Sequence, residues 1–100
     1  TYNTLALSLS QEEIKKKFDK RMNKFEKLFL YLPFMHSESP KIQRESIKLF
    51  KSMRDKGILW FARDHKKIID RFGRYPHRNR ARGERSTAAE LKFMQKHKGY

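Results

Sequence analysis

The segment from Ile58 to Phe72 most constrains the fold, because its apolar side chains recur at the spacing of one helix face. The residues on that face are Ile58, Phe61, Ala62, His65, Ile68, Ile69 and Phe72, whereas Arg63, Lys66, Lys67 and Asp70 fall on the opposite face. An apolar stripe of this period predicts an amphipathic α-helix with one buried side. Gly73 follows directly and is predicted to end the helix.

Two helices are predicted in the first third of the chain. The first runs from Tyr2 to about Lys17, and its apolar positions are Leu5, Ala6, Leu9, Ile14 and Phe18. The second begins near Met22 or Asn23 and carries a stripe of Phe25, Leu28, Phe29 and Leu32. Pro33 cannot donate a backbone hydrogen bond, so it is predicted to kink or end this helix.

Two more helices are predicted from capping signals. Ser39 and Pro40 are typical of the N-cap and first helical positions, and they open a helix that Gly57 is predicted to end. Its apolar residues are Ile42, Leu49 and Met53, with Ile47 and Phe50 beside them. Thr87 and Glu90 have the spacing of a capping box before a short helix to about Lys96. In that helix, Leu91 and Met94 are predicted to face inward.

The fold class follows from these segments and from what is missing between them. No stretch alternates apolar and polar residues with a period of two, so no strand is predicted. Residues 1–100 are therefore expected to form a single all-α domain of about five short antiparallel helices. The pairing of the helices through short connections favours a stack of helical hairpins.

The net charge is the strongest indication of function. The chain has 25 Lys and Arg against 11 Asp and Glu, which gives a net charge of +14. Such an excess favours a polyanionic partner, namely nucleic acid, an anionic membrane surface or an acidic protein, although a solvated basic surface is the alternative. The chain has no cysteine, as is typical of intracellular proteins, and no apolar run long enough to span a membrane.

The positive charge is densest between residues 71 and 85, a segment called the arginine loop below. It carries Arg71, Arg74, Arg78, Arg80, Arg82 and Arg85, interleaved with Tyr75 and His77. Lys66 and Lys67 precede it, and Lys15, Lys16 and Lys17 add to the positive surface. Arginines on an irregular loop can contact phosphates, and the rings between them can stack on unpaired bases. The arginine loop is therefore predicted to contact RNA.

A second hypothesis places a small-anion pocket in two loops that could converge. Its residues are His36, Glu38, His77, Arg78 and Asn79. A guanidinium group can hold a phosphate or carboxylate in a bidentate manner. The alternative is that Arg78 and Asn79 brace the loop by hydrogen bonding to carbonyls at the end of the preceding helix.

Other kinds of chemistry find little support. Ser37 lacks the flanking glycines of a nucleophile elbow, and no glycine-rich phosphate loop precedes a helix. The spacing of the histidines matches no metal-ligand motif. No catalytic residue, metal or cofactor is therefore expected. His65 lies in an apolar stripe and is expected to be packed in the core rather than to react.

Two strings of residues resemble a known family. They are Phe29-Leu30-Tyr31-Leu32-Pro33-Phe34-Met35-His36-Ser37-Glu38 and Arg71-Phe72-Gly73-Arg74-Tyr75-Pro76-His77-Arg78-Asn79, followed by Gly83, Ser86, Thr87 and Glu90. Together they resemble the domain-of-unknown-function 924 family, which is mainly bacterial and has a tetratricopeptide-repeat-like fold. The resemblance covers nearly the whole chain and implies an all-α array. It implies no reaction, because none is settled for the family.

This sequence departs from the family in two respects. Family members are about twice as long, so the chain resembles their C-terminal half and lacks the first half with its Asp-Gln-Phe-Pro-Arg-Asn motif. Arg80 and Arg82 stand where the family has small or aliphatic residues, and Glu84 stands where it tends to have arginine. Half of a helical array leaves exposed the face that the other half would cover.

The sequence thus predicts a non-enzymatic helical module that contacts RNA and other protein chains in a larger assembly. A ribosome-like particle, such as an organellar one, would suit a small and basic version of a bacterial fold. The expected location is intracellular, in the mitochondrial matrix or the cytoplasm. Two alternatives remain open: an enzyme or small-anion binder using the five pocket residues, and a tetratricopeptide-like scaffold that binds only protein. An anionic membrane surface is a less favoured partner.

Overall fold

The computed structural model describes residues 2–100, with side chains from Thr4 onward, and confirms the all-α fold. Its α-helices are α1 (Tyr2–Lys15), α2 (Lys24–Met35), α3 (Pro40–Ser52), α4 (Lys56–Phe72) and α5 (Ala88–Lys96). Two 3₁₀ turns, η1 (Phe18–Arg21) and η2 (Pro76–Arg78), lie in the connections. Within the described residues there is no strand, and no helix is long and apolar enough to cross a membrane.

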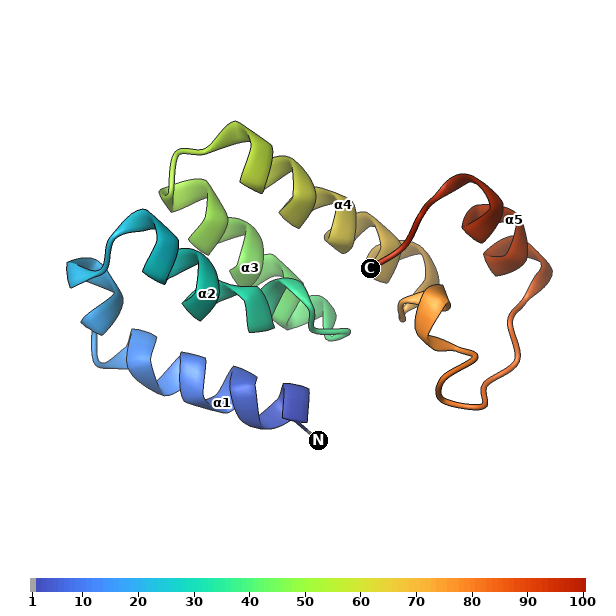
Figure 1. The fold of residues 1–100 in the computed structure, drawn as a ribbon, viewed down its shortest axis with the longest axis horizontal. Coiled ribbons are helices and arrows are strands. Elements are labelled where there is room, and N and C mark those ends of the chain that lie inside the picture. The colour runs from blue at the N-terminus through green and yellow to red at the C-terminus, as the bar shows by residue number, and fades with distance from the viewer. Residues whose placement is uncertain (1) are drawn as a thin grey trace.

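The helices α1 to α4 lie side by side in chain order, and each runs back along its predecessor (Figure 1). The connections between them are short, which is why consecutive helices pack as antiparallel neighbours. The short α5 lies beyond the C-terminal end of α4, at the far side of the arginine loop (Figure 1). The molecule is consequently elongated, with extents of 45 × 29 × 20 Å.

The core consists of two clusters. The larger joins α2, α3 and α4 through the buried side chains of Tyr31, Met35, Phe50 and Ala62. The rings of Tyr31 and Phe50 meet edge to face, with 5.8 Å between their centroids. The smaller cluster packs Tyr75 of the arginine loop against Ile68 and Ile69 of α4. The loop is therefore attached to the helical array by its own buried side chain.

The predicted helix ends agree with the structure where a local cap defines them. Ser39 caps α3 with Pro40 as its first residue, and Thr87 and Glu90 form the capping box of α5. Gly73 ends α4 with φ of 72°. These ends are confirmed because each depends on residues within one turn of helix.

The predicted helix end at Gly57 is wrong. Of the two effects predicted for Pro33, a kink or an end, the second does not occur: α2 continues to Met35, since the missing backbone donor costs only one hydrogen bond near the end of the helix. Gly57 does not end α3, which stops at Ser52, where Arg54 takes the left-handed conformation with φ of 57°. Gly57 instead lies in the first turn of α4, which Asp55 caps.

Several predicted core positions are also wrong. Leu91 of α5 is 54% exposed and Phe61 of α4 is 51% exposed. In α3 the fully buried positions are Gln43, Ser46 and Phe50, whereas Leu49 and Met53 of the predicted stripe are partly buried and pack against the core. Apolar residues here occupy more than one face of each helix, so the apolar pattern alone does not select the face that is buried.

Gly57 and Gly73 provide a matched test of where α3 and α4 end. Gly57→Ala is expected to raise the free energy of unfolding by ~0.5–1 kcal/mol, because alanine has the higher helix propensity and its Cβ meets only the Asp55 carboxylate at 3.4 Å. Gly73→Ala is expected to lower it by about 1 kcal/mol, because φ of 72° disfavours a side chain. Urea denaturation monitored by circular dichroism measures both values. Destabilisation by Gly57→Ala would instead support the original prediction that Gly57 ends α3.

Candidate functional site

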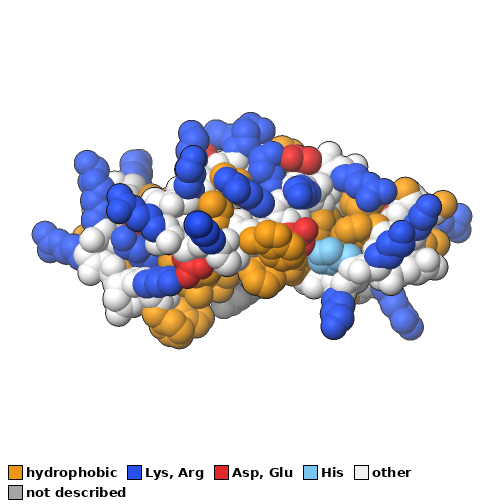
Figure 2. All heavy atoms as spheres, turned by 90° about the horizontal axis from the view of Figure 1, so that it is seen from above, with side chains coloured by type: hydrophobic (Ala, Val, Ile, Leu, Met, Phe, Trp, Pro, Cys, Tyr) orange, Lys and Arg blue, Asp and Glu red, His pale blue; other side chains and the backbone are white. Residues whose placement is uncertain are grey.

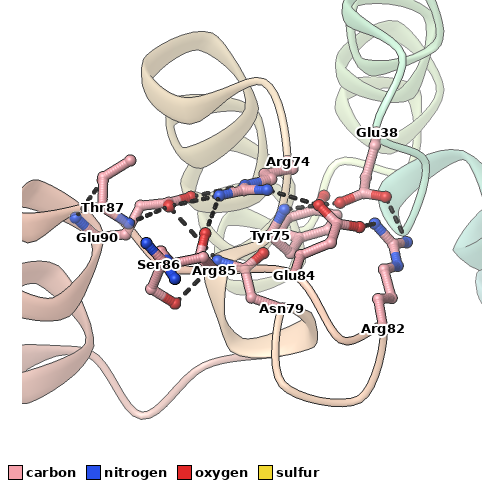
Figure 3. A network of polar contacts seen from close by, with 10 residues as sticks. All are labelled: Glu38, Arg74, Tyr75, Asn79, Arg82, Glu84, Arg85, Ser86, Thr87 and Glu90. Atoms are coloured by element: carbon pink, nitrogen blue, oxygen red, sulfur yellow. Dashed lines mark hydrogen bonds and ion pairs between the residues drawn. The ribbon is translucent and has the colours of Figure 1, made fainter.

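The arginine loop is built around Arg74, which binds two carboxylates. Its Nε and Nη2 donate to the two carboxylate oxygens of Glu90 at 2.9 and 2.7 Å, and its Nη1 donates to Glu84 at 2.5 Å (Figure 3). Nη2 also donates to the Arg85 carbonyl at 3.0 Å. Glu90 is 2% exposed, so this bidentate pair closes the loop against α5.

The ion pair with Arg74 keeps Glu90 ionised. The hydrogen bonds from Arg74 outweigh the effect of burial and lower the pKa of Glu90 to about 2, with further help from the Thr87 amide. Asn79 is also buried, and its Nδ2 donates to Ser86 at 3.1 Å and to Glu90 at 3.4 Å. Asn79 thus braces the loop as the sequence suggested, but through α5 and its cap rather than through carbonyls at the end of α4.

Glu38 holds the other side of the loop. Its carboxylate accepts a hydrogen bond from the Tyr75 amide at 2.7 Å and pairs with Arg82 at 2.5 Å (Figure 3). Arg78 lies 3.9 Å from the same carboxylate. Burial opposes ionisation of Glu38, but the hydrogen bonds from Arg82 and Tyr75 hold its pKa below the ordinary value. Glu38 is therefore ionised at neutral pH and already occupied by cations.

A buried polar contact that the sequence did not reveal fixes the Tyr75 side chain. The Tyr75 hydroxyl donates to the Met35 carbonyl at 2.7 Å and accepts from Gln43 Nε2 at 2.9 Å. Gln43 Nε2 also lies 2.7 Å from the Ser37 carbonyl. The burial of Gln43 could have been inferred only from its spacing to Ser46 and Phe50, which places the three on a single face of α3. Burial raises the pKa of Tyr75.

The structure buries or pairs many of the residues predicted to contact RNA. Tyr75 is 1% exposed, so the expectation that its ring is free to stack on a base is wrong. The guanidinium of Arg78 lies over that ring, 4.4 Å from its centroid, while Arg74 and Arg82 are paired with carboxylates. His77 has its Nε2 within 2.9 Å of the His97 carbonyl.

The remaining cations of the prediction are more accessible. Arg71 lies over the Phe72 ring and Lys66 pairs with Asp70 at 2.6 Å. Arg80, Arg85 and Lys67 are exposed, and no carboxylate pairs with their side chains in the described part of the chain. Only a minority of the predicted contact residues therefore offer an uncompensated charge to a phosphate.

The five residues of the predicted anion pocket are divided between two places. His36, Glu38 and Arg78 line a groove of about 990 Å³ between α1, α2 and the arginine loop. Asn79 is buried beneath the loop, and His77 packs against Phe93 of α5 instead. Burial and the positive charge of Arg78 lower the pKa of His36, so this side chain is neutral at neutral pH.

The core position of His65 is clear from its contacts. Its Nδ1 lies 2.7 Å from the Phe61 carbonyl, and its ring stacks on Tyr100 at a centroid distance of 3.5 Å. Burial lowers the pKa of His65 to about 4. Asp64 next to it accepts hydrogen bonds from His97 and Tyr100, which holds the C-terminal residues on α4. Among the described side chains, no three His, Cys, Asp or Glu residues are placed to hold a metal ion.

The fold and this braced loop define an all-α protein of the tetratricopeptide-like class. The chain belongs to DUF924, a family described as bacterial protein of unknown function, whose sequence profile matches residues 1–98. It is similar to the solved structure of a protein of unknown function from Agrobacterium tumefaciens, at 29% identity and a TM-score of 0.90. The alignment covers 95% of this chain and 53% of that one, so the chain spans about half the length of this relative. Functionally curated proteins give no match.

Replacement of Glu90 tests the anchoring of the loop. Glu90→Gln is expected to lower the free energy of unfolding at neutral pH by roughly 2 kcal/mol, because charged hydrogen bonds to a buried group are lost. The pKa of Glu90 is about 2 in the folded protein, against an ordinary value of 4.5. Its contribution to the free energy of unfolding is therefore complete above pH 4.5 and is lost as the pH falls towards 2. Denaturation curves of the variant should lack that part of the acid dependence. Glu84→Gln, at an exposed partner of Arg74, is the control and should change stability little.

Proposed function

We propose that this chain is a non-enzymatic helical interaction module that is held in a larger assembly and contacts RNA. The observation that carries the proposal is that the described part of the protein presents two extended surfaces that none of its own helices covers or neutralises. One is an apolar face on α1 and α2, and the other is a basic surface with too few carboxylates to neutralise it. An apolar surface and a basic surface in one small domain suit a protein that bridges another chain and a polyanion.

The apolar face supports the protein contact. Leu5, Leu9, Phe25 and Phe29 are each 60–68% exposed on neighbouring helices. Leu9 and Phe29 both line the groove between α1 and α2, together with Leu7 and Leu32. Large exposed apolar patches of this kind mark interaction sites in soluble proteins. The relative from Agrobacterium tumefaciens is nearly twice as long with the same fold, which supports a helical partner segment as the occupant.

The charge supports the RNA contact. With 25 Lys and Arg against 11 Asp and Glu, at least half of the cations have no acidic partner available. Loop arginines that pair with Glu38, Glu84 and Glu90 use some of those few carboxylates. The positive charge elsewhere is then left for phosphates. An enzymatic or small-anion site has less support, because Glu38 occupies the guanidinium groups that an anion would need.

Purification of the native complex from its source tests the proposal as a whole. The protein is expected to run in a large particle and to be released from it by ribonuclease or by raised salt, because phosphate contacts are screened by ions. Release by neither treatment, from an equally large particle, would favour the scaffold that binds only protein. A small species that responds to neither would contradict the proposal.

The apolar face is tested separately by charge insertion. The double variant Leu9→Glu with Phe29→Glu is expected to keep its helical content, because both side chains are already about 61% exposed. It is expected no longer to co-purify with the particle, because the two charges fall in the proposed interface. Co-purification with the particle, together with circular dichroism, measures the two properties. Leu91→Glu, at an exposed leucine of α5, is the matched control and should remain in the particle. Retention of the double variant would remove this face from the proposed interface.

A further inference from the structure

The groove between α3 and α4 brings together five cations, four of which form no ion pair among the described residues. It has a volume of about 390 Å³ and is lined by Arg44 and Lys48 of α3, and by Arg63, Lys66 and Lys67 of α4. Ile47 contributes an apolar side chain to the lining. Figure 2 views the molecule from above Figure 1, where α4 lies uppermost, and shows Lys and Arg side chains spread across this side with few acidic ones.

The acidic residues of α3 and α4 do not neutralise the groove. Asp70, the one carboxylate that lines it, is bound by Lys66 at 2.6 Å. Asp64 is occupied by His97 and Tyr100, and Glu45 lines a different hollow beside α1. Within the described residues, no ion pair involves Arg44, Lys48, Arg63 or Lys67, and all four are exposed.

The spacing of these four cations is unfavourable for the protein alone. Arg44 and Lys48 are four residues apart on α3, and Arg63 and Lys67 are four residues apart on α4. Side chains at that spacing lie beside each other, so each like-charged pair destabilises its helix. The two pairs also face the same groove, which adds their potentials. A bound polyanion would remove this repulsion.

The arginine loop, although richer in arginine, is a weaker candidate for the same contact. Arg74 and Arg82 are held by Glu90, Glu84 and Glu38, and Arg78 lies on the Tyr75 ring. A phosphate that bound there would compete with carboxylates of the same chain. In the groove between α3 and α4, a phosphate would replace only water and mobile counterions.

We propose that the groove between α3 and α4 binds the phosphate backbone of RNA, with Arg44, Lys48, Arg63 and Lys67 as its contact residues. This inference rests on the proposed RNA contact and names the surface that makes it. The four side chains are flexible cations on rigid helices, and no aromatic ring or amide lies among them to read a base. Binding should therefore depend on charge and be independent of base sequence.

The experiment compares two variants of the full chain that each lose four positive charges. The groove variant carries Arg44→Gln, Lys48→Gln, Arg63→Gln and Lys67→Gln. The control variant carries Arg80→Gln, Arg85→Gln, Lys92→Gln and Lys96→Gln, all at exposed positions outside the groove. Glutamine keeps a high helix propensity, so both variants should fold, as circular dichroism will show. The probe is a fluorescently labelled RNA hairpin, and binding is measured by anisotropy over a series of salt concentrations.

The groove variant is expected to bind more weakly than the control, and the slope of log affinity against log salt should fall by about 3 when four phosphate contacts are lost. The control variant should keep most of the slope. An equal loss of RNA affinity in the two variants would overturn the inference, because net charge alone would then explain binding. A larger loss of affinity in the control variant would also overturn it, and would assign the contact to the arginine loop and α5. Failure of the unaltered chain to bind the hairpin would overturn the proposed RNA contact itself, a distinct outcome.

Discussion

The pairing of Arg74 with Glu90 is the interaction on which the C-terminal third of the protein depends. The arginine loop has little apolar content, and two like-charged arginine side chains cannot approach closely without anions between them. The Glu90 carboxylate supplies that anion from α5 while its second role, in the capping box with Thr87, fixes the start of the same helix. One buried carboxylate thus positions both the loop and the helix that follows it.

The loop also has a fixed orientation relative to the helical array. Tyr75 inserts its ring beside Ile68 and Ile69 and ties its hydroxyl to the α2–α3 connection through Met35 and Gln43. Glu38 binds the Tyr75 amide from the same connection. Buried polar groups are costly unless they are hydrogen-bonded, so these contacts favour one orientation of the loop more than they add net stability.

These contacts have a consequence for the distribution of charge. In a chain with 11 acidic residues, the loop uses Glu38, Glu84 and Glu90 to neutralise itself. Fewer carboxylates are then available to the cations of α3 and α4, of which Arg44, Lys48, Arg63 and Lys67 form no ion pair with a described residue. Much of the most arginine-rich segment consequently has a structural role, while Arg80 and Arg85 of the loop and the four groove cations of α3 and α4 stay exposed without an ion pair among the described residues.

The sequence by itself determined the all-α class, the approximate limits of the helices and the caps at Ser39, Gly73 and Thr87, because helix formation and capping depend on residues within one or two turns. Tertiary structure decided the rest. Gly57 became part of α4 because Asp55 capped the helix upstream of it, and Leu91 and Phe61 remain about half exposed once the described helices have packed. Tertiary structure also decided which arginines are paired, since Glu90 meets Arg74 across 16 positions and Glu38, between α2 and α3, meets Arg82. Charges can be counted in a sequence, but pairs between distant positions exist only once the helices have packed.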